Sequence, residues 1–265
     1  MHVFDQAIAL EGAGDLFRGT ASEAYWAFVG PFGGITAATI LSALTLHPGH
    51  AGHPLALTVN YCAPVAAGTF DIALRLVRQN RSSQHWLVEL SQAGIVVTFA
   101  SAVFAARRAS WSHQEAPFPH APPFEHFESS PAIPGRWTDQ YDFRFIEGDA
   151  RIGEPLSGDE RVYSRLWISD RQPRQIDMLS LTSMSDAFFA RVFHAKREIV
   201  PFGTVSLTTY FHVDADELAA LNITRVLAVV DGKVFHNSFG DQSAELWSPH
   251  GRLLATTTQI GYFKA

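Results

Sequence analysis

Hydrophobic and polar positions alternate with two different spacings along the first hundred residues. Residues 35–46, ITAATILSALTL, are apolar on nearly every side of a helix, and Gly33 and Gly34 precede them. A helix without a polar face has to be surrounded by protein, so this segment predicts a buried helix. Four runs rich in β-branched and aromatic residues follow, separated by Gly, Pro, Asn or Ser, and they predict strands. These runs are residues 55–63, 69–80, 82–94 and 95–107.

The same order recurs in the second half of the chain. Residues 162–170 predict a strand and residues 176–193 predict a helix, and four more strand-like runs follow at residues 204–213, 223–232, 233–248 and 252–264. Asp231 and Gly232 separate two of these runs, and Asp-Gly is a favoured pair for a tight hairpin turn. Short connections favour antiparallel neighbours. One buried helix against an antiparallel sheet, made twice, is an α+β arrangement.

A proline-rich, aromatic segment separates the two halves. Proline removes a backbone donor and fixes its own backbone angle, so the segment predicts an extended, irregular connection. We therefore expect an N-terminal unit at residues 1–108, a linker at residues 109–137 and a C-terminal unit at residues 138–265. The linker residues Phe118, Phe124 and Phe127 are expected to cover a sheet rather than to line a pocket, because aromatic residues usually bury area structurally.

Composition and charge narrow the classes of function. Hydrophobic residues make up 47% of the chain and charged residues 17%, which is the balance of a globular protein. The formal net charge is −6, and Lys and Arg are scattered, so we expect no nucleic-acid partner. No apolar run is long enough to cross a bilayer, and the N-terminus does not resemble a secretory signal. We therefore expect a cytoplasmic protein without membrane insertion.

Candidate nucleophiles and metal ligands are few. The single cysteine, Cys62, excludes an internal disulfide and a multi-cysteine metal site, and we expect it to be a small buried residue within a strand. The G-x-S-x-G motif of α/β-hydrolases is absent. His47, His50 and His53 are closely spaced, but no carboxylate or cysteine interleaves them, so a polar loop is expected. We expect neither a metal nor a cofactor.

Several segments together resemble one known family. Phe32-Gly33-Gly34 opens the apolar helix, as an FGG segment does in that family, and Met184-Ser185-Asp186 matches its Ser-Asp pair. Residues 204–212 match a strand of the form T-x-x-x-x-x-W-F-H, with Tyr210 in place of the tryptophan, and residues 254–259 match a V-A-S-T-x-Q ending. These segments are similar to the bacterial acyl-CoA thioesterase II family and its mammalian peroxisomal relatives, which are double-hotdog proteins.

The resemblance implies an acyl-CoA thioesterase with Asp186, Thr204 and Gln259 as its catalytic residues. An ionised carboxylate can accept a proton from water as a general base, while a hydroxyl and a primary amide can hold that water in line with the thioester carbonyl. Gly33 and Gly34 are candidates for contact with the oxyanion, because they allow close approach at a helix N-terminus. The connection between Asp186 and Thr204 is shorter than in the family, so the acyl chain length is not carried over.

Other interpretations stay open from the sequence. An enoyl-CoA hydratase or dehydratase with the same fold is the nearest alternative, although no acid–histidine pair opens either predicted helix. A non-catalytic acyl-CoA-binding protein is another. Taken singly, Asp186 could be a solvated helix residue, Thr204 an ordinary strand residue and Gln259 part of an exposed strand face. Exposed sheet edges leave assembly into a homo-oligomer open.

Overall fold

The computed structural model describes residues 1–130, 135–155 and 161–264. The first half contains α1 (Val3–Ala7), β1 (Leu10–Ala13), β2 (Leu16–Thr20), α2 (Gly33–Leu46), β3 (His53–Tyr61), β4 (Thr69–Gln79), β5 (Ser83–Gln92) and β6 (Ile95–Ala105). The second half contains β7 (Tyr141–Glu147), β8 (Tyr163–Asp170), α3 (Met178–Met184), α4 (Arg191–Lys196), β9 (Phe202–Phe211), α5 (Ala215–Leu221), β10 (Arg225–Asp231), β11 (Phe235–His236), β12 (Phe239–Trp247) and β13 (Leu253–Phe263). Among the described residues, short 3-10 helices lie at Glu23–Tyr25, Phe124–His126 and Arg136–Gln140.

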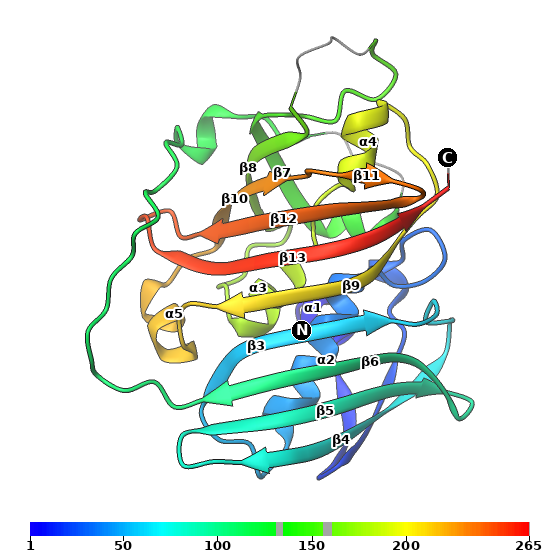
Figure 1. Cartoon of the computed structure of the whole chain (residues 1–265), viewed down its shortest axis with the longest axis vertical. Coiled ribbons are helices and arrows are strands. Elements are labelled where there is room, and N and C mark those ends of the chain that lie inside the picture. The colour runs from blue at the N-terminus through cyan, green and yellow to red at the C-terminus, as the bar shows by residue number, and fades with distance from the viewer. Residues whose placement is uncertain (131–134, 156–160, 265) are drawn as a thin grey trace.

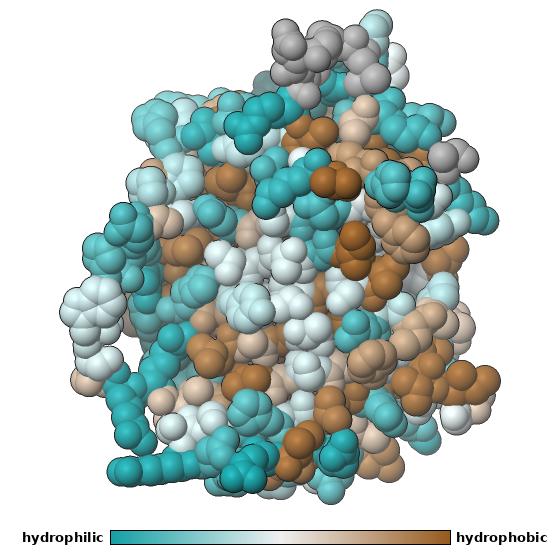
Figure 2. Space-filling view, in the orientation of Figure 1, coloured by the Kyte–Doolittle hydropathy of each residue, from teal (hydrophilic) through white to brown (hydrophobic). Residues whose placement is uncertain are grey.

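The strands form one continuous antiparallel sheet in which the two halves meet edge to edge (Figure 1). The strand order is β1-β2-β4-β5-β6-β3-β9-β13-β12-β10-β8-β7, with β11 paired to β12. The seam is the antiparallel pair β3–β9, where Thr58 faces Thr208 and their hydroxyl oxygens lie 3.0 Å apart. Figure 2 shows the outer face of this region as pale, near-neutral surface. The α+β double-hotdog architecture expected from the sequence is confirmed.

The buried helices lie behind the sheet and pack against each other. Nearly all residues of α2 are buried, as its all-round apolar composition predicts, and its N-terminal turn approaches the end of α3. Gly34 makes this approach possible, because a Cβ atom built there would lie 2.3 Å from the Ser183 carbonyl oxygen. The start of α2, from the first half, therefore lies against the end of α3, from the second half.

The linker crosses the outer face of the second half of the sheet. Phe124 and Phe127 pack against a small apolar cluster formed by Trp167, Leu227 and Trp247. The Phe118 ring also lies edge-on to Trp247, with 5.9 Å between centroids. The expectation that these aromatic residues cover a sheet is confirmed.

The predicted helix at residues 176–193 is wrong in its extent, because the segment forms two helices, α3 and α4, with an irregular stretch between them. Every residue from Leu181 to His194 is buried. The aromatic residues Phe188 and Phe189 of the irregular stretch line a cavity instead of continuing a helical face. The sequence pattern also missed α1, β1, β2, β7 and α5.

The predicted hairpin turn at Asp231-Gly232 is also wrong. Asp231 pairs with Ser243, so the connection between β10 and β12 is long and contains the short strand β11. The tight turn lies at Asn237 and Ser238, whose φ angles are 47° and 69°. Two successive positive φ angles are those of a type I′ turn, which matches the twist of a hairpin. No helix among the described residues is both long and apolar enough to cross a membrane.

Candidate active site

Asp186 lies in the turn that follows α3. Asp177 caps this helix: its carboxylate accepts a hydrogen bond from Ser180 N, and the Ser180 hydroxyl accepts one from Asp177 N. Beyond Met184, the last helical residue, a bond from Asp186 N to Ser183 O continues the turn. The cap and the turn fix Asp186 at the end of a short, buried helix rather than within a long one.

Burial dominates the electrostatics of Asp186. Its side chain is 7% exposed, so the interpretation as a solvated surface residue is wrong. Burial raises the pKa of the Asp186 carboxyl to about 7, while hydrogen bonds from the Gln259 side chain and the Gly34 backbone act in the opposite direction. A carboxyl group with a pKa near neutrality can both accept and return a proton, as general acid–base catalysis requires.

Thr204 faces the interior because β9 contains a bulge. Ser206 pairs with Ile260 and Thr204 pairs with Gly261, so Val205 is an extra residue on β9. In a regular strand, alternation from the buried Leu207 would turn Val205 inward and Thr204 outward. A β-bulge re-aims the side chains beside it, and here it turns the Thr204 hydroxyl inward.

Gln259 links the other two residues. It lies on β13 and is 7% exposed, so the interpretation as part of an exposed strand face is wrong. The Thr204 hydroxyl donates a hydrogen bond of 2.9 Å to Gln259 Oε1. Since Oε1 accepts this bond, the Gln259 Nε2 group is the donor to Asp186. The structure therefore gathers all three predicted residues into one hydrogen-bonded group.

The first half contributes the start of α2 to the same place. A Cβ atom built on Gly33 would lie 2.6 Å from Asp186 Oδ2, so only glycine fits there without a shift. The Tyr61 hydroxyl donates a hydrogen bond of 2.7 Å to the Gly33 carbonyl oxygen. Burial and the neighbouring Asp186 raise the pKa of the Tyr61 hydroxyl well above its ordinary value. Tyr61 is therefore a neutral donor that fixes the backbone beside the Asp186 carboxylate.

A cavity of about 280 Å³ lies beside these groups and is lined by both halves of the chain. Its polar wall carries the three predicted residues together with Tyr61 and Gln242. The rest of the wall is largely apolar and includes Trp137 and Phe193, and the exposed residue Val29 lies at its margin. An apolar cavity with a few convergent polar groups is typical of a small-molecule site.

The sequence interpretation missed Tyr61 and Gln242. Gln242 lies on β12 directly opposite Gln259, and it is buried on the inward face that it shares with Gly240 and Ala244. A polar residue at an inward position of an alternating strand is a signal that the sequence does carry. Tyr61 offers no such signal, because an aromatic residue suits any strand.

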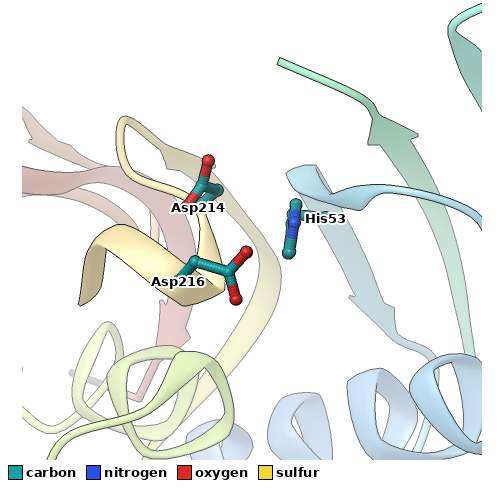
Figure 3. Close-up of side chains that lie close together, drawn as sticks. All are labelled: His53, Asp214 and Asp216. Carbon is teal, nitrogen blue, oxygen red and sulfur yellow. The ribbon is translucent and has the colours of Figure 1, made fainter. Parts of the chain in front are cut away.

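The three histidines near the start of β3 do not come together on one ligand. His47 Nε2 contacts Asp15 and His50 Nδ1 contacts the His47 carbonyl oxygen. Figure 3 shows that His53 instead faces Asp214 and Asp216 of the second half, with potential ligand atoms all within 4.8 Å.

Both His53 and Asp214 already have structural contacts at this junction. Asp214 caps α5 by accepting a hydrogen bond from Glu217 N, and Ala215 N donates to His53 Nδ1. These contacts explain why the three side chains lie together: they join the two halves of the chain.

Cys62 is exposed just beyond the end of β3, so the expectation of a buried strand residue is wrong. The strand ends at Tyr61, and Cys62 begins the irregular segment at the margin of the cavity. Its neighbours Ala63 and Pro64 are exposed as well. Proline cannot donate to a strand ladder, which is consistent with the strand ending before it.

Comparisons with known proteins agree with this architecture. The sequence profile of the acyl-CoA thioesterase C-terminal domain matches residues 112–263, and that of the N-terminal domain matches residues 22–105. No curated protein sequence matches the chain.

Two solved structures illustrate the similarity. A conserved protein of unknown function with a hot dog fold from Alicyclobacillus acidocaldarius is 41% identical, with a TM-score of 0.94, and the match covers 100% of this chain and 99% of that one. An acyl-CoA thioesterase II from Mycobacterium marinum is 22% identical, with a TM-score of 0.76 and 98% of both chains covered. The two profile matches, which together span most of the sequence, establish that this chain belongs to the acyl-CoA thioesterase family.

Proposed function

We propose that this protein hydrolyses an acyl-CoA to a free acid and CoA, with Asp186 as the general base and Thr204 and Gln259 positioning the attacking water. The observation that carries the proposal is the hydrogen-bonded group formed by the buried Asp186 and Gln259 and the half-buried Thr204 on the wall of an apolar cavity. The apolar wall suits an acyl chain, and the polar wall suits the thioester. Membership of the family supports the same substrate class.

The proposed reaction requires one proton to move twice. Ionised Asp186 takes a proton from water while the water oxygen attacks the thioester carbonyl carbon, which gives a tetrahedral oxyanion. The carbon–sulfur bond then breaks, and Asp186 returns the proton to the departing CoA sulfur. The Gln259 amide oxygen accepts from Thr204, so only its Nε2 group is left to donate. Nε2 carries two N–H groups: one donates to Asp186, and the second can donate to the water.

Gly33 and Gly34 remain in the proposal as the segment that approaches the oxyanion. Gly34 N–H also bonds to Asp186, so this donor helps to hold the base in place. We assign the Gly33 N–H as an oxyanion donor, since it lies at the start of α2, where the helix dipole favours negative charge. The active site would then require both halves of the chain.

We also propose the division into an N-terminal hotdog at residues 1–108, a linker at residues 109–137 and a C-terminal hotdog at residues 138–265. The two profile matches support a boundary near residue 108, because one ends at residue 105 and the other begins at residue 112. Under this division Tyr61 and Gly33 belong to the first hotdog and the three proposed catalytic residues to the second.

Substitution of Asp186 tests the proposed function. The purified protein is incubated with acyl-CoAs of short, medium, long and aromatic acyl groups, and released CoA is followed with a thiol reagent. We expect hydrolysis by the wild type and a fall of roughly 10²–10⁴-fold in kcat for Asp186→Asn, which cannot act as a base. Rates equal to the buffer blank across the whole panel would refute the proposal.

A parallel arm addresses the alternative with the same fold. A hydratase would pair an acidic group with a histidine, and no histidine is among the described residues that line the cavity. Loss of the conjugated absorbance of an enoyl-CoA without release of thiol would favour hydration over hydrolysis. Tight binding of acyl-CoA without either reaction would favour a binding protein.

A further inference from the structure

Gln242 is a buried amide that the proposed reaction does not yet use. It is 5% exposed and lines the cavity, yet its Oε1 atom has no hydrogen-bond partner among the described residues. Buried polar groups are normally paired, and an unpaired one is destabilising. The described residues therefore do not hold the amide through Oε1, which leaves the orientation of the side chain open to a ligand in the cavity.

The position of Gln242 places it beside the proposed reaction centre. It pairs directly with Gln259 across β12 and β13, so the two side chains project from the same face. Directly opposite residues of an antiparallel pair have Cβ atoms about 4.5–5.5 Å apart. A thioester whose carbonyl carbon meets water held by Gln259 therefore has its carbonyl oxygen within reach of a neighbouring glutamine side chain.

The proposed reaction has so far given the oxyanion only one donor, the Gly33 N–H. The oxyanion needs donors, and Gly34 N–H also serves Asp186. Since no described residue holds Gln242 Oε1, no hydrogen bond at that atom fixes the amide, and Nε2 can turn to donate into the cavity. Glutamine side chains are among the groups that form oxyanion holes together with backbone amides.

We propose that Gln242 is a further catalytic residue, whose side-chain N–H donates a hydrogen bond to the thioester oxygen and, with Gly33 N–H, forms the oxyanion hole. This inference rests on the proposed hydrolysis, and it adds a role for β12 that neither the sequence nor the family resemblance assigned. The donor acts on the charge that develops in the transition state, so it contributes to kcat more than to substrate binding.

Replacement of Gln242 by Met tests the proposal. Methionine removes the amide and keeps the side-chain length, and loss of an unpaired buried amide does not lower stability. We expect kcat to fall about 10²–10³-fold with little change in KM. Ser243→Ala, the adjacent residue on the opposite face, serves as the control with unchanged kcat. A Gln242→Met enzyme with wild-type kcat would overturn the proposal.

Binding of two substrate analogues separates a catalytic role from a structural one. A ketone analogue, with a methylene in place of sulfur, keeps the carbonyl oxygen, whereas a thioether analogue lacks it. Gln242→Met should bind the ketone about 3–10-fold more weakly and the thioether equally well. Equal weakening of both would show a packing effect and overturn the assignment. Because this arm needs no turnover, it can be measured even if the wild type proves not to hydrolyse acyl-CoA.

Two further results have a clear meaning. If methionine prevents folding, Gln242→Asn keeps an amide but withdraws it by one methylene, and the same loss in kcat and in ketone binding is expected. If instead Gln242→Met slows only 3-hydroxyacyl-CoA and leaves the unsubstituted acyl-CoA of equal length unaffected, the amide recognises a substituent on the acyl group. That outcome would overturn the oxyanion role.

Discussion

At the scale of single residues, the site depends on a carboxyl group kept away from water. Asp186 is only 7% exposed, and it accepts two hydrogen bonds. Burial raises its pKa more than the hydrogen bonds lower it, so the pKa lies near 7 rather than at the ordinary 3.8. The same feature predicts both the pH dependence of catalysis and that of stability, because the ionised form needed for catalysis is the form that folding disfavours.

The rate of hydrolysis is expected to rise with pH through an apparent pKa of about 7, the pKa of Asp186 in the free enzyme. An ordinary aspartate would give full activity well below this pH. The measurement is kcat/KM for one acyl-CoA from pH 5 to pH 9, and a flat profile above pH 5 would contradict the assignment of Asp186 as the base.

Asp186→Asn is expected to stabilise the protein at alkaline pH. The pKa is raised on folding, so the folded state holds a proton that the unfolded state has lost between about pH 4 and pH 7, and stability falls as pH rises through that window. At pH 8 the full penalty is present, and its removal raises the free energy of unfolding by up to about 4 kcal/mol. Urea denaturation at pH 8 and pH 4 measures it, and the gain should shrink towards pH 4.

The sequence predicts only part of the site. Asp186, Thr204 and Gln259 were selected by their resemblance to a family, and the structure brings them together. The sequence did not reveal that Tyr61 fixes Gly33 or that Gln242 is unpaired, because both facts depend on partners distant along the chain.

At the scale of elements, a one-residue irregularity sets the direction of Thr204. The extra residue Val205 in β9 interrupts the alternation, so Thr204 faces the interior next to Gln259. Strand patterns in the sequence predicted β9 itself but not its bulge, since a bulge is defined by pairing with β13. The same limit explains why the sequence placed the hairpin turn at Asp231-Gly232, a more usual turn pair, and not at Asn237 and Ser238, where it lies.

Exchanging Thr204 and Val205 tests the bulge. The double variant Thr204→Val/Val205→Thr keeps the composition and moves the hydroxyl by one residue, to the position that a regular strand would turn inward. With the bulge present, the hydroxyl leaves the site, and kcat is expected to fall about 10²-fold. Thr204→Ser, which keeps the hydroxyl in place, should retain most of the activity. Wild-type kcat in the exchanged variant would show that the bulge does not control the site.

At the scale of the whole molecule, the two hotdogs share one sheet and one cavity. The repeated order of helix and strands and the proline-rich break were readable from the sequence, because periodicity and proline content are local properties. The seam between β3 and β9 was not readable, since nothing local to either strand specifies its partner. The sequence pattern did not predict the short strands β1, β2 and β7, because short strands carry little periodic signal.

The part of the linker around Phe124 is expected to stabilise the fold without affecting catalysis. Phe124 packs on the outer apolar cluster, and the Arg144 guanidinium lies 3.8 Å from its ring centroid. Phe124→Ala should therefore lower the free energy of unfolding by roughly 1–3 kcal/mol through lost apolar and cation–π contact. Urea denaturation measures this loss, with His126→Ala on the same short helix as the exposed control. A change in kcat would contradict the separation of Phe124 from the cavity.

The hydrogen-bonded seam also bears on how a substrate enters. Two domains joined by a hinge can open a cleft between them, but β3 and β9 are central strands of a single sheet, and parting them would break a backbone ladder in the middle of the molecule. Such central strands exchange their amide hydrogens only through large-scale unfolding. We therefore expect access to the cavity to depend on the exposed residues that line it, such as Phe28 and Val29, and the rate of acyl-group entry to respond to their size.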